Sequence, residues 1–286
     1  MAITAADVKK LRDATGAGMM DAKKALTEAD GDFEKAVEIL RVSGAAKAAK
    51  RADRDAANGL VAASGNALIH LGSETDFVAK NAEFIELGQA IAEAVDRAGA
   101  DGRQAALEVE LADGRTVAEA IGEIAAKIGE KIELADAARL PGAIDVYLHR
   151  RNPDLPPQVG VAVAYEGDDA EFVHQVALQI ASMSPQYLTR EDVPADVLAK
   201  ERRIAEETAK EEGKPEKIIE KMVEGRINKF YEEVCLLEQK FVKDPEKKIA
   251  DVLGLVEVKA FTRYQLGEGI EKKQEDFAAE VAAQIK

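Results

Sequence analysis

The sequence predicts an α+β protein with an N-terminal three-helix domain, a two-part mixed core with antiparallel sheets, an inserted antiparallel helical hairpin and a C-terminal helix. Three observations support this prediction. Apolar residues recur at helical spacing over 4–42, alternate with a period of two after residue 59, and form a narrow stripe within the highly charged segment 190–237. A chain of 286 residues has room for one large domain or for two to three small ones.

The first helices are separated by strong turn signals. Gly16 and Gly18 in "TGAG" permit a tight reversal after the first helix, and "DG" at 30–31 closes the second. Asp32 then caps the third helix, "FEKAVEILRVSG". We expect Gly44 to end this helix and the Ala/Lys/Arg-rich stretch that follows to be a linker that can be partly helical.

The core shows both periodicities. "GLVAA" and "NALIHL" flank "SGN" and predict a β-hairpin. Helices are expected at about 81–98, 117–128 and 169–182, and Thr116 with Glu119 predicts a capping box on the second of them. Further strands are predicted at "KIELADAARL", "AIDVYLH" and "VGVAVAY".

Segment 190–237 is predicted to form the hairpin. Gly213 and Pro215 in "EEGKPEK" enforce a reversal between two charged helices. The apolar residues of the second helix are spaced by fours and threes, which is the pattern of a coiled-coil seam. They are Ile219, Val223, Ile227, Phe230, Val234 and Leu237. A short helix at 246–253, a strand at "VEVKAFTRYQ" and a terminal helix at "QEDFAAEVAAQI" are expected to follow.

These elements divide the chain into five predicted parts. The N-terminal helical domain and its linker span 1–55, and the first part of the core spans 56–141. The second part of the core combines 142–187 with 236–270, because the hairpin at 188–235 is inserted into it. Residues 271–286 form a C-terminal module.

The charge balance and the single cysteine limit the classes of function. A formal net charge of −15 argues against direct nucleic-acid binding, which needs a basic surface. Residues 1–55 hold 11 Lys/Arg and 10 Asp/Glu, so the acidity lies beyond them. Cys235 alone can form no internal disulfide, which fits a reducing cytosol. Because no apolar run could span a bilayer and no signal-peptide pattern is present, we expect a cytoplasmic protein that does not bind membranes.

The motifs of common active sites are absent from the sequence. His70, His149 and His174 are scattered, and no CxxC or HExxH motif supports a zinc site. No GxSxG motif is present, and Cys235 has no His near it in the chain. Without GxxxxGK[ST] the chain has no phosphate-binding loop of its own. These absences favour a multi-part binding protein over an enzyme, and we expect no cofactor.

The stretch "SETDFVAKNAEF" places Asp76 and Phe77 side by side in a strand-to-helix connection. Periodicity alone favours Phe77 as a core anchor, since an aromatic residue at the start of a helix usually packs inward. The alternative is an exposed working tip. The helix that follows supports this alternative, because its apolar stripe is complete without Phe77.

Four segments in order along the chain are distinctive: "LRDATGAGMMDAKKALTEADGDFEKAVEILR" (11–41), "TDFVAKNAEF" (75–84), "EGKPEKIIEKMVEGRINKF" (212–230) and "GEGIEKKQEDFAAEVAA" (267–283). Together they resemble the bacterial elongation factor Ts family, the guanine-nucleotide exchange factors of elongation factor Tu. The resemblance implies that the N-terminal helices form a ubiquitin-associated-like (UBA-like) domain. It also implies that elongation factor Tu is the partner.

The resemblance assigns the central role to Thr75, Asp76, Phe77 and Val78. In the family the Asp-Phe pair inserts into the nucleotide-binding domain of Tu, close to the bound Mg²⁺. Displacing this Mg²⁺ weakens GDP binding, so GDP is released and GTP is loaded without covalent chemistry. The GDP and Mg²⁺ belong to the partner, so the resemblance implies no cofactor for this chain.

Further partner contacts are implied at Lys23, Ile128, Gly129, His149 and Val242. Each also has a purely structural interpretation. Lys23 can be one solvated lysine among several, and "KIGE" can be an ordinary helix C-cap. The predicted hairpin can contact Tu, mediate self-association or simply project into solvent.

Two features depart from the family pattern: His70 replaces a common acidic residue, and the loop at 150–158 is longer than usual. Two rival functions stay open from the sequence. An adaptor would bind a Tu-like GTPase without promoting exchange, and a hydrolase would use carboxylates hidden in the acidic core.

Overall fold

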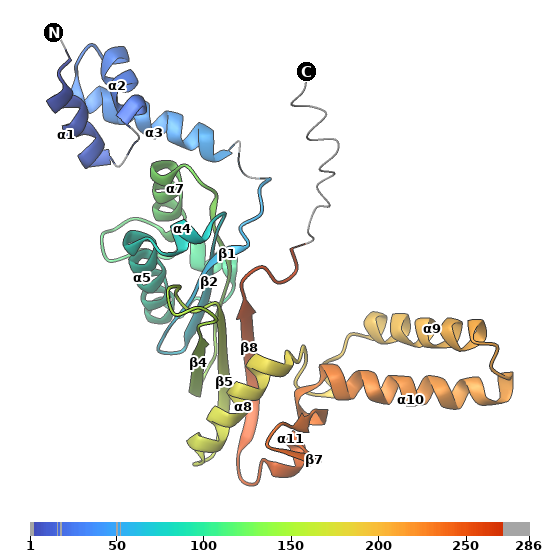
Figure 1. Cartoon of the computed structure of the whole chain (residues 1–286). Coiled ribbons are helices and arrows are strands. Elements are labelled where there is room, and N and C mark those ends of the chain that lie inside the picture. The colour runs from blue at the N-terminus through green and yellow to red at the C-terminus, as the bar shows by residue number, and fades with distance from the viewer. Residues whose placement is uncertain (1–2, 16, 18, 50, 52, 271–286) are drawn as a thin grey trace.

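The computed structural model describes residues 3–15, 17, 19–49, 51 and 53–270 and confirms the α+β prediction. Three N-terminal helices precede two three-stranded antiparallel sheets, each with helices on its outer side (Figure 1). A long helical hairpin projects from the second sheet's part of the molecule. The predicted terminal helix lies outside the described residues. Among the helices of the described part, none combines the length and apolar content needed to cross a bilayer.

The N-terminal bundle consists of α1 (Ala5–Thr15), α2 (Met19–Glu28) and α3 (Phe33–Ala49). Its small core contains the buried side chains of Leu11, Leu26 and Ala36. As the sequence predicts, the Asp32 carboxylate accepts a hydrogen bond from the N–H of Lys35 at 3.1 Å. The prediction that Gly44 ends α3 is wrong, because the helix continues to Ala49.

Helix α3 continues because it docks against α7 (Val117–Ile128), a helix of the core. At Gly44 the two helices lie so close that a Cβ atom there would come within 2.7 Å of the Ala126 Cβ. Glycine therefore serves close helix packing here rather than helix termination. The stretch after Gly44, predicted to be a linker that can be partly helical, is helical as far as Ala49.

The first part of the core is a sheet in the order β1-β2-β3. Its strands are β1 (Asn58–Ser64), β2 (Ala67–Ser73) and β3 (Ile132–Arg139), and its helices are α4 (Asp76–Ala79), α5 (Ala82–Ala98), α6 (Arg103–Leu107) and α7. Helix α5 packs across β1 and β2. The fully buried Phe84 and Ile91 of α5 meet Leu71 and Leu134 of the sheet in one core cluster. The predicted capping box of Thr116 and Glu119 is present at the start of α7.

The second part of the core is a sheet in the order β4-β5-β8, covered by α8. Its elements are β4 (Ala143–His149), β5 (Val159–Glu166), β8 (Glu257–Gln265) and α8 (Ala170–Met183). The central strand β5 is buried on both faces. Val161 and Val163 contribute to the core shared with α8, while Ala162 joins Val61 and Leu68 in a cluster between the two sheets. The two sheets therefore pack directly on each other.

The predicted hairpin is formed by α9 (Ala195–Glu211) and α10 (Glu216–Val234). Ala205 and Ala209 of α9 are buried, as are Ile219 and Ile227 from the predicted seam of α10. Small side chains on one helix and branched ones on the other allow a close antiparallel pair. Self-association through the hairpin stays a prediction.

Beyond the hairpin, the predicted helix at 246–253 is wrong in its first half. Residues Asp244–Lys248 form β7, which pairs with β6 (Lys240–Phe241), and only Ile249–Val252 form a helix, α11. The charged residues of β7 gave no apolar alternation from which a strand could be predicted. Pairing with β6 decides the conformation there.

The base of the hairpin is held by a carboxylate, Glu238, that lies between two cations. Its oxygens accept hydrogen bonds from Arg190 at 2.6 and 3.0 Å and from Lys248 Nζ at 2.7 Å. The paired Arg190 guanidinium, and next the Lys248 ammonium, lower the pKa of Glu238 to about 2 although burial opposes this. The contact joins the start of the hairpin to the β6–β7 ribbon.

We predict that Glu238→Gln lowers the free energy of unfolding at pH 7 by about 1–2 kcal/mol, the range for partly exposed charge-assisted hydrogen bonds. The ordinary pKa of 4.5 exceeds the folded-state value of about 2. The ionised carboxylate therefore stabilises the fold above pH 4.5, and this contribution is lost as the pH falls toward 2. Urea unfolding between pH 7 and pH 3 tests this. Glu246→Gln, which changes an exposed carboxylate of β7, is the control. A difference in unfolding free energy between wild type and Glu238→Gln that does not shrink with falling pH would contradict the prediction.

A second prediction concerns Gly44. In an undocked helix, Gly→Ala would stabilise by about 1 kcal/mol through helix propensity. Against Ala126, the added methyl group instead forces α3 away from α7, so we expect Gly44→Ala to lower the thermal midpoint and expose α3 to limited proteolysis. Gly225→Ala in α10, where a Cβ meets no atom within 4 Å, is the matched control and should raise the midpoint. Stabilisation by both substitutions would show that the bundle is not docked.

Candidate functional site

The segment between β2 and α5 forms a short projecting element, which we call the tip and define as Thr75–Val78. Its residues form most of the one-turn helix α4 and the N-cap in front of it. The Thr75 Oγ1 accepts a hydrogen bond from the N–H of Val78 at 3.4 Å. The sequence predicts a strand-to-helix connection here, and the structure forms it as a capped helical turn.

The exposures of the tip residues decide between the two interpretations of Phe77. Its side chain is 79% exposed, while the neighbouring Val78 is 5% exposed and lies in the core cluster. Phe84, at the start of α5, is fully buried. Val78 and Phe84 are thus the core anchors, and the core-anchor interpretation of Phe77 is wrong. An aromatic side chain held in solvent is available for contact with another molecule.

Asp76 lies beside Phe77 at the start of α4. Its carboxylate is partly exposed and forms an ion pair with Lys80 Nζ at 3.1 Å, one helical turn along the chain. An exposed pair of this kind contributes little free energy. It can therefore open at small cost when another donor approaches the Asp76 carboxylate.

The base of the tip is held by Glu130, which follows α7. The Glu130 carboxylate accepts hydrogen bonds from the Thr75 N–H at 3.2 Å and from the Thr75 hydroxyl at 2.9 and 3.0 Å. These bonds join residues 55 positions apart in the chain. They attach the N-cap of α4 to the α7–β3 connection.

A second carboxylate, Glu74, lies directly before the tip with its side chain only 10% exposed. It accepts a 2.6 Å hydrogen bond from the Lys131 N–H, and it pairs with Arg54 at 2.9 Å and Arg51 at 3.4 Å. Burial opposes ionisation, but the Lys131 N–H and the two guanidinium groups outweigh it and lower the pKa of Glu74. Glu74 and Glu130 therefore connect the tip to α7 and to the segment that follows α3.

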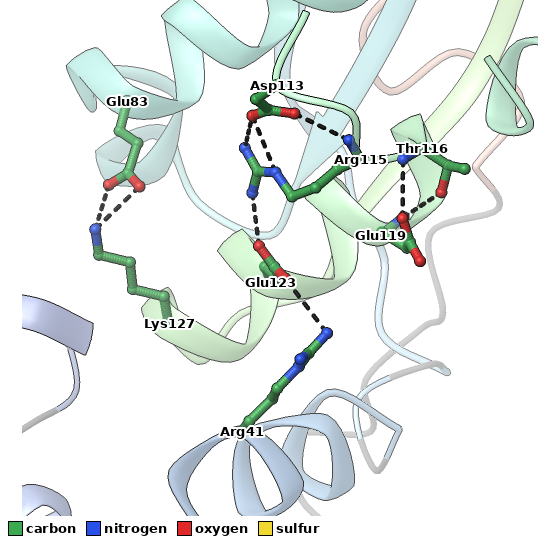
Figure 2. Close-up of polar contacts among 8 residues, drawn as sticks. All are labelled: Arg41, Glu83, Asp113, Arg115, Thr116, Glu119, Glu123 and Lys127. Atoms are coloured by element: carbon green, nitrogen blue, oxygen red, sulfur yellow. Dashed lines mark hydrogen bonds and ion pairs between the residues drawn. The ribbon is translucent and has the colours of Figure 1, made fainter. Parts of the chain in front are cut away.

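Helix α7 is itself fixed by ion pairs along its length (Figure 2). Lys127 Nζ lies 2.8 Å from the Glu83 carboxylate of α5. Glu123 accepts from Arg115 at 2.6 Å and from Arg41 of α3 at 3.5 Å, and Arg115 also pairs with Asp113. The helix that leads to Glu130 is thus attached to α5, to the preceding loop and to the N-terminal bundle.

A cleft of about 670 Å³ lies between the bundle and helices α5 and α7. Its lining is largely apolar and includes Val37, Leu40 and Leu87. Most of the charged side chains on its wall are those that pair with one another in Figure 2. Three of the carboxylates on the wall, those of Glu83, Asp113 and Glu123, are therefore engaged with cations.

Ile128 and Gly129, two of the implied partner contacts, end α7 directly before Glu130. Gly129 has a φ of 80° and forms the left-handed C-cap, and Ile128 packs at the edge of the core. The structural interpretation of both residues holds. Because Glu130 bonds to Thr75, both also lie near the base of the tip.

His149 ends β4, and its Nδ1 lies 2.8 Å from the Tyr147 hydroxyl. The loop 150–158 that follows is ordered, since Gln158 donates to the His149 carbonyl and the Pro157 carbonyl accepts from Val61 of β1. Together with Asp76, this loop lines a notch of about 130 Å³. The long loop therefore lies beside the tip.

The remaining implied contacts lie elsewhere. Lys23 is exposed on α2 of the bundle. Val242, in the β6–β7 turn, is 57% exposed, and its N–H donates to Gln179 of α8 at 2.9 Å. The candidate contacts thus fall on the bundle, around the tip and on the second part of the core, rather than in one pocket.

Burial shifts the pKa of two residues discussed from the sequence, Cys235 and His70. Cys235 is fully buried, and burial raises the pKa of its thiol to about 11, so it is not a nucleophile at neutral pH. His70 lies in β2 opposite Asp136 of β3, and burial lowers the pKa of its imidazole although nearby carboxylates oppose this. In the described part of the chain, no three His, Cys, Asp or Glu residues are grouped as metal ligands.

The sequence predicts no role for Glu74 or Glu130. Glu74 stands in "SETDFVAKNAEF" and Glu130 in "KIGE", but each is one of 54 acidic residues and no spacing links either of them to Thr75. Glu130 does follow a helix-ending glycine, but that position usually carries no functional meaning. Only their contacts with the base of the tip identify them.

Comparison with known proteins agrees with the resemblance seen in the sequence. A family model described as "Elongation factor TS" matches residues 74–268. A protein named elongation factor Ts from Cutibacterium acnes is 65% identical over 270 residues, covering 94% of this chain and 100% of that protein. Proteins with the same name from Saccharopolyspora erythraea and Salinispora tropica are 54% and 56% identical, each covering 93% of this chain and 98% of their own length. The chain therefore belongs to the elongation factor Ts family, the nucleotide exchange factors of translation elongation.

Proposed function

We propose that this protein binds elongation factor Tu in its GDP form, inserts the Thr75–Val78 tip near the Mg²⁺ site of Tu, and thereby promotes GDP release and GTP loading. Family membership supports the exchange role. The single observation that carries the finer proposal is the 79% exposure of Phe77 on an ordered turn. An exposed aromatic side chain that the core does not need is suited to enter a partner.

The proposed mechanism is displacement. In a GTPase of this kind GDP would be held by a bound Mg²⁺ and by backbone N–H groups of the phosphate-binding loop. Phe77 offers a rigid apolar volume that can occupy a slot in the partner and shift the elements around it. The Asp76 carboxylate, after releasing Lys80, can accept hydrogen bonds that hold the shifted state. When Mg²⁺ is displaced, GDP binds more weakly and leaves.

Exchange by this route is reciprocal. If the protein weakens GDP binding to Tu by some factor, GDP weakens binding of the protein to Tu by the same factor. Incoming GTP therefore releases the protein, which acts again without being consumed. A coupling of about 4 kcal/mol would correspond to roughly a thousandfold change in affinity.

The other implied contacts are proposed to hold Tu while the tip acts. Ile128, Gly129 and His149 would extend the surface around the tip. Lys23 on the bundle and Val242 on the second part of the core would provide separate attachment points. Binding at several points lets the tip be driven into a site that it would not enter alone.

An adaptor that binds Tu without promoting exchange is a rival to this proposal. It predicts that loss of the tip leaves GDP release unchanged. No observation favours it over exchange, because an adaptor needs no aromatic side chain held out on an ordered turn.

We predict that wild-type protein accelerates release of fluorescent GDP from elongation factor Tu, and that Phe77→Ala reduces this acceleration by about thirtyfold or more, the size expected for a hot-spot aromatic residue. Because the Phe77 side chain is 79% exposed, the thermal midpoint of the Phe77→Ala variant should match that of the wild type. Leu255→Ala, which removes a 97% exposed side chain from another surface, is the control and should exchange normally. A wild-type protein without effect on GDP release would contradict the proposed function, and a fully active Phe77→Ala variant would contradict only the role of the tip.

A further inference from the structure

The tip has little stability of its own. A single four-residue helical turn is unfavourable in water, because forming the first turn orders several residues for one hydrogen bond. Phe77 adds no burial that would offset this cost, and within the tip only Val78 packs in the core cluster. The tip is nevertheless a capped turn, so contacts outside α4 must hold it in place.

Glu130 makes such contacts. One carboxylate accepts both the backbone N–H and the side-chain hydroxyl of Thr75, at 3.2 and 2.9 Å. Hydrogen bonds to an ionised acceptor are stronger than those between neutral groups. Because the Thr75 hydroxyl also caps α4, Glu130 fixes both the position and the orientation of the first residue of the tip.

The support for Glu130 is a rigid helix. It follows the Gly129 cap of α7, and the ion pairs of Lys127 and Glu123 attach α7 to α5 and α3 (Figure 2). The close contact of Gly44 with Ala126 lies within the last turn of α7. The docked N-terminal bundle and the tip are therefore attached to the same end of one helix.

We infer that Glu130 is a positioning residue for nucleotide exchange: its carboxylate holds Thr75 so that the tip is in its working conformation before the partner is met. This inference rests on the proposed function. Glu130 need not touch the partner. A tip ordered in advance loses less conformational entropy when it inserts, so more of the binding free energy is available to shift the nucleotide site.

The test compares Glu130→Ala and Glu130→Gln with wild type in the GDP-release assay. Loss of two charge-assisted hydrogen bonds should lower the second-order rate constant for release by about tenfold in Glu130→Ala. Glu130→Gln keeps one acceptor oxygen and should fall between wild type and Glu130→Ala. Glu133→Gln is the matched control, because Glu133 is also half-buried and pairs with Lys131 but makes no contact with Thr75. The Glu133→Gln variant should promote GDP release at the wild-type rate.

Hydrogen exchange separates positioning from general destabilisation. In the Glu130 variants, the amides of 75–78 should exchange faster, while those of α7 keep their protection. Faster exchange throughout α7 and β3 would overturn the inference, since Glu130 would then stabilise the whole region. If Glu130→Ala does not fold, Glu130→Gln carries the same test with an expected loss of about threefold in rate.

A double-mutant cycle tests the route through Thr75. If Glu130 acts by holding Thr75, the losses in exchange rate for Thr75→Ala and Glu130→Ala should not multiply, and the double variant should be no more than about twofold slower than the worse single variant. Multiplicative losses would overturn the inference. Wild-type protein that fails to release GDP would instead contradict the proposed function, and folded Glu130 variants with wild-type rates would contradict the positioning role alone.

Discussion

The hydrogen bonds between the Glu130 carboxylate and Thr75 are the contact on which the tip depends. A one-turn helix is unfavourable on its own, and α4 buries only Val78 and Ala79, so it depends on contacts with the rest of the protein. A charged acceptor that meets two donors of one residue supplies the missing constraint. Glu74 adds a second constraint one residue earlier, through its contacts with the Lys131 N–H, Arg51 and Arg54.

The stability of the core does not depend on the exposed side chains of the tip. Phe84, Ile91 and Leu134 form a core that is complete without Phe77. Val78 alone anchors the tip to that core. The apolar packing that keeps the domain folded does not involve Phe77 or Asp76. Substitutions at these two positions can therefore change contacts with a partner without disturbing the core.

Helix α7 joins parts that lie far apart in the chain. The bundle docks on it through Gly44 and Ala126, and its C-terminal end leads into Glu130 and hence to the tip. The exposed ion pairs along α7 contribute little free energy individually, so close packing of the two helix backbones is the stronger link. The bundle and the tip thus have a defined relative position rather than a tethered one.

Local patterns in the sequence determined most of the elements: the period-two strands, the capping box of Thr116 and Glu119, the hairpin seam and the family resemblance around "TDFVAKN". They failed where tertiary contact overrode them. Gly44 looked like a helix end but permits a helix crossing, and 244–248 lacked strand periodicity but pairs with a neighbouring strand. The direction in which Phe77 points, and the roles of Glu74 and Glu130, were decided only by the tertiary structure. The physical reason is the distance along the chain. Glu130 is 55 positions from Thr75, so the sequence pattern around the tip carries no information about it, and only folding brings the two residues together.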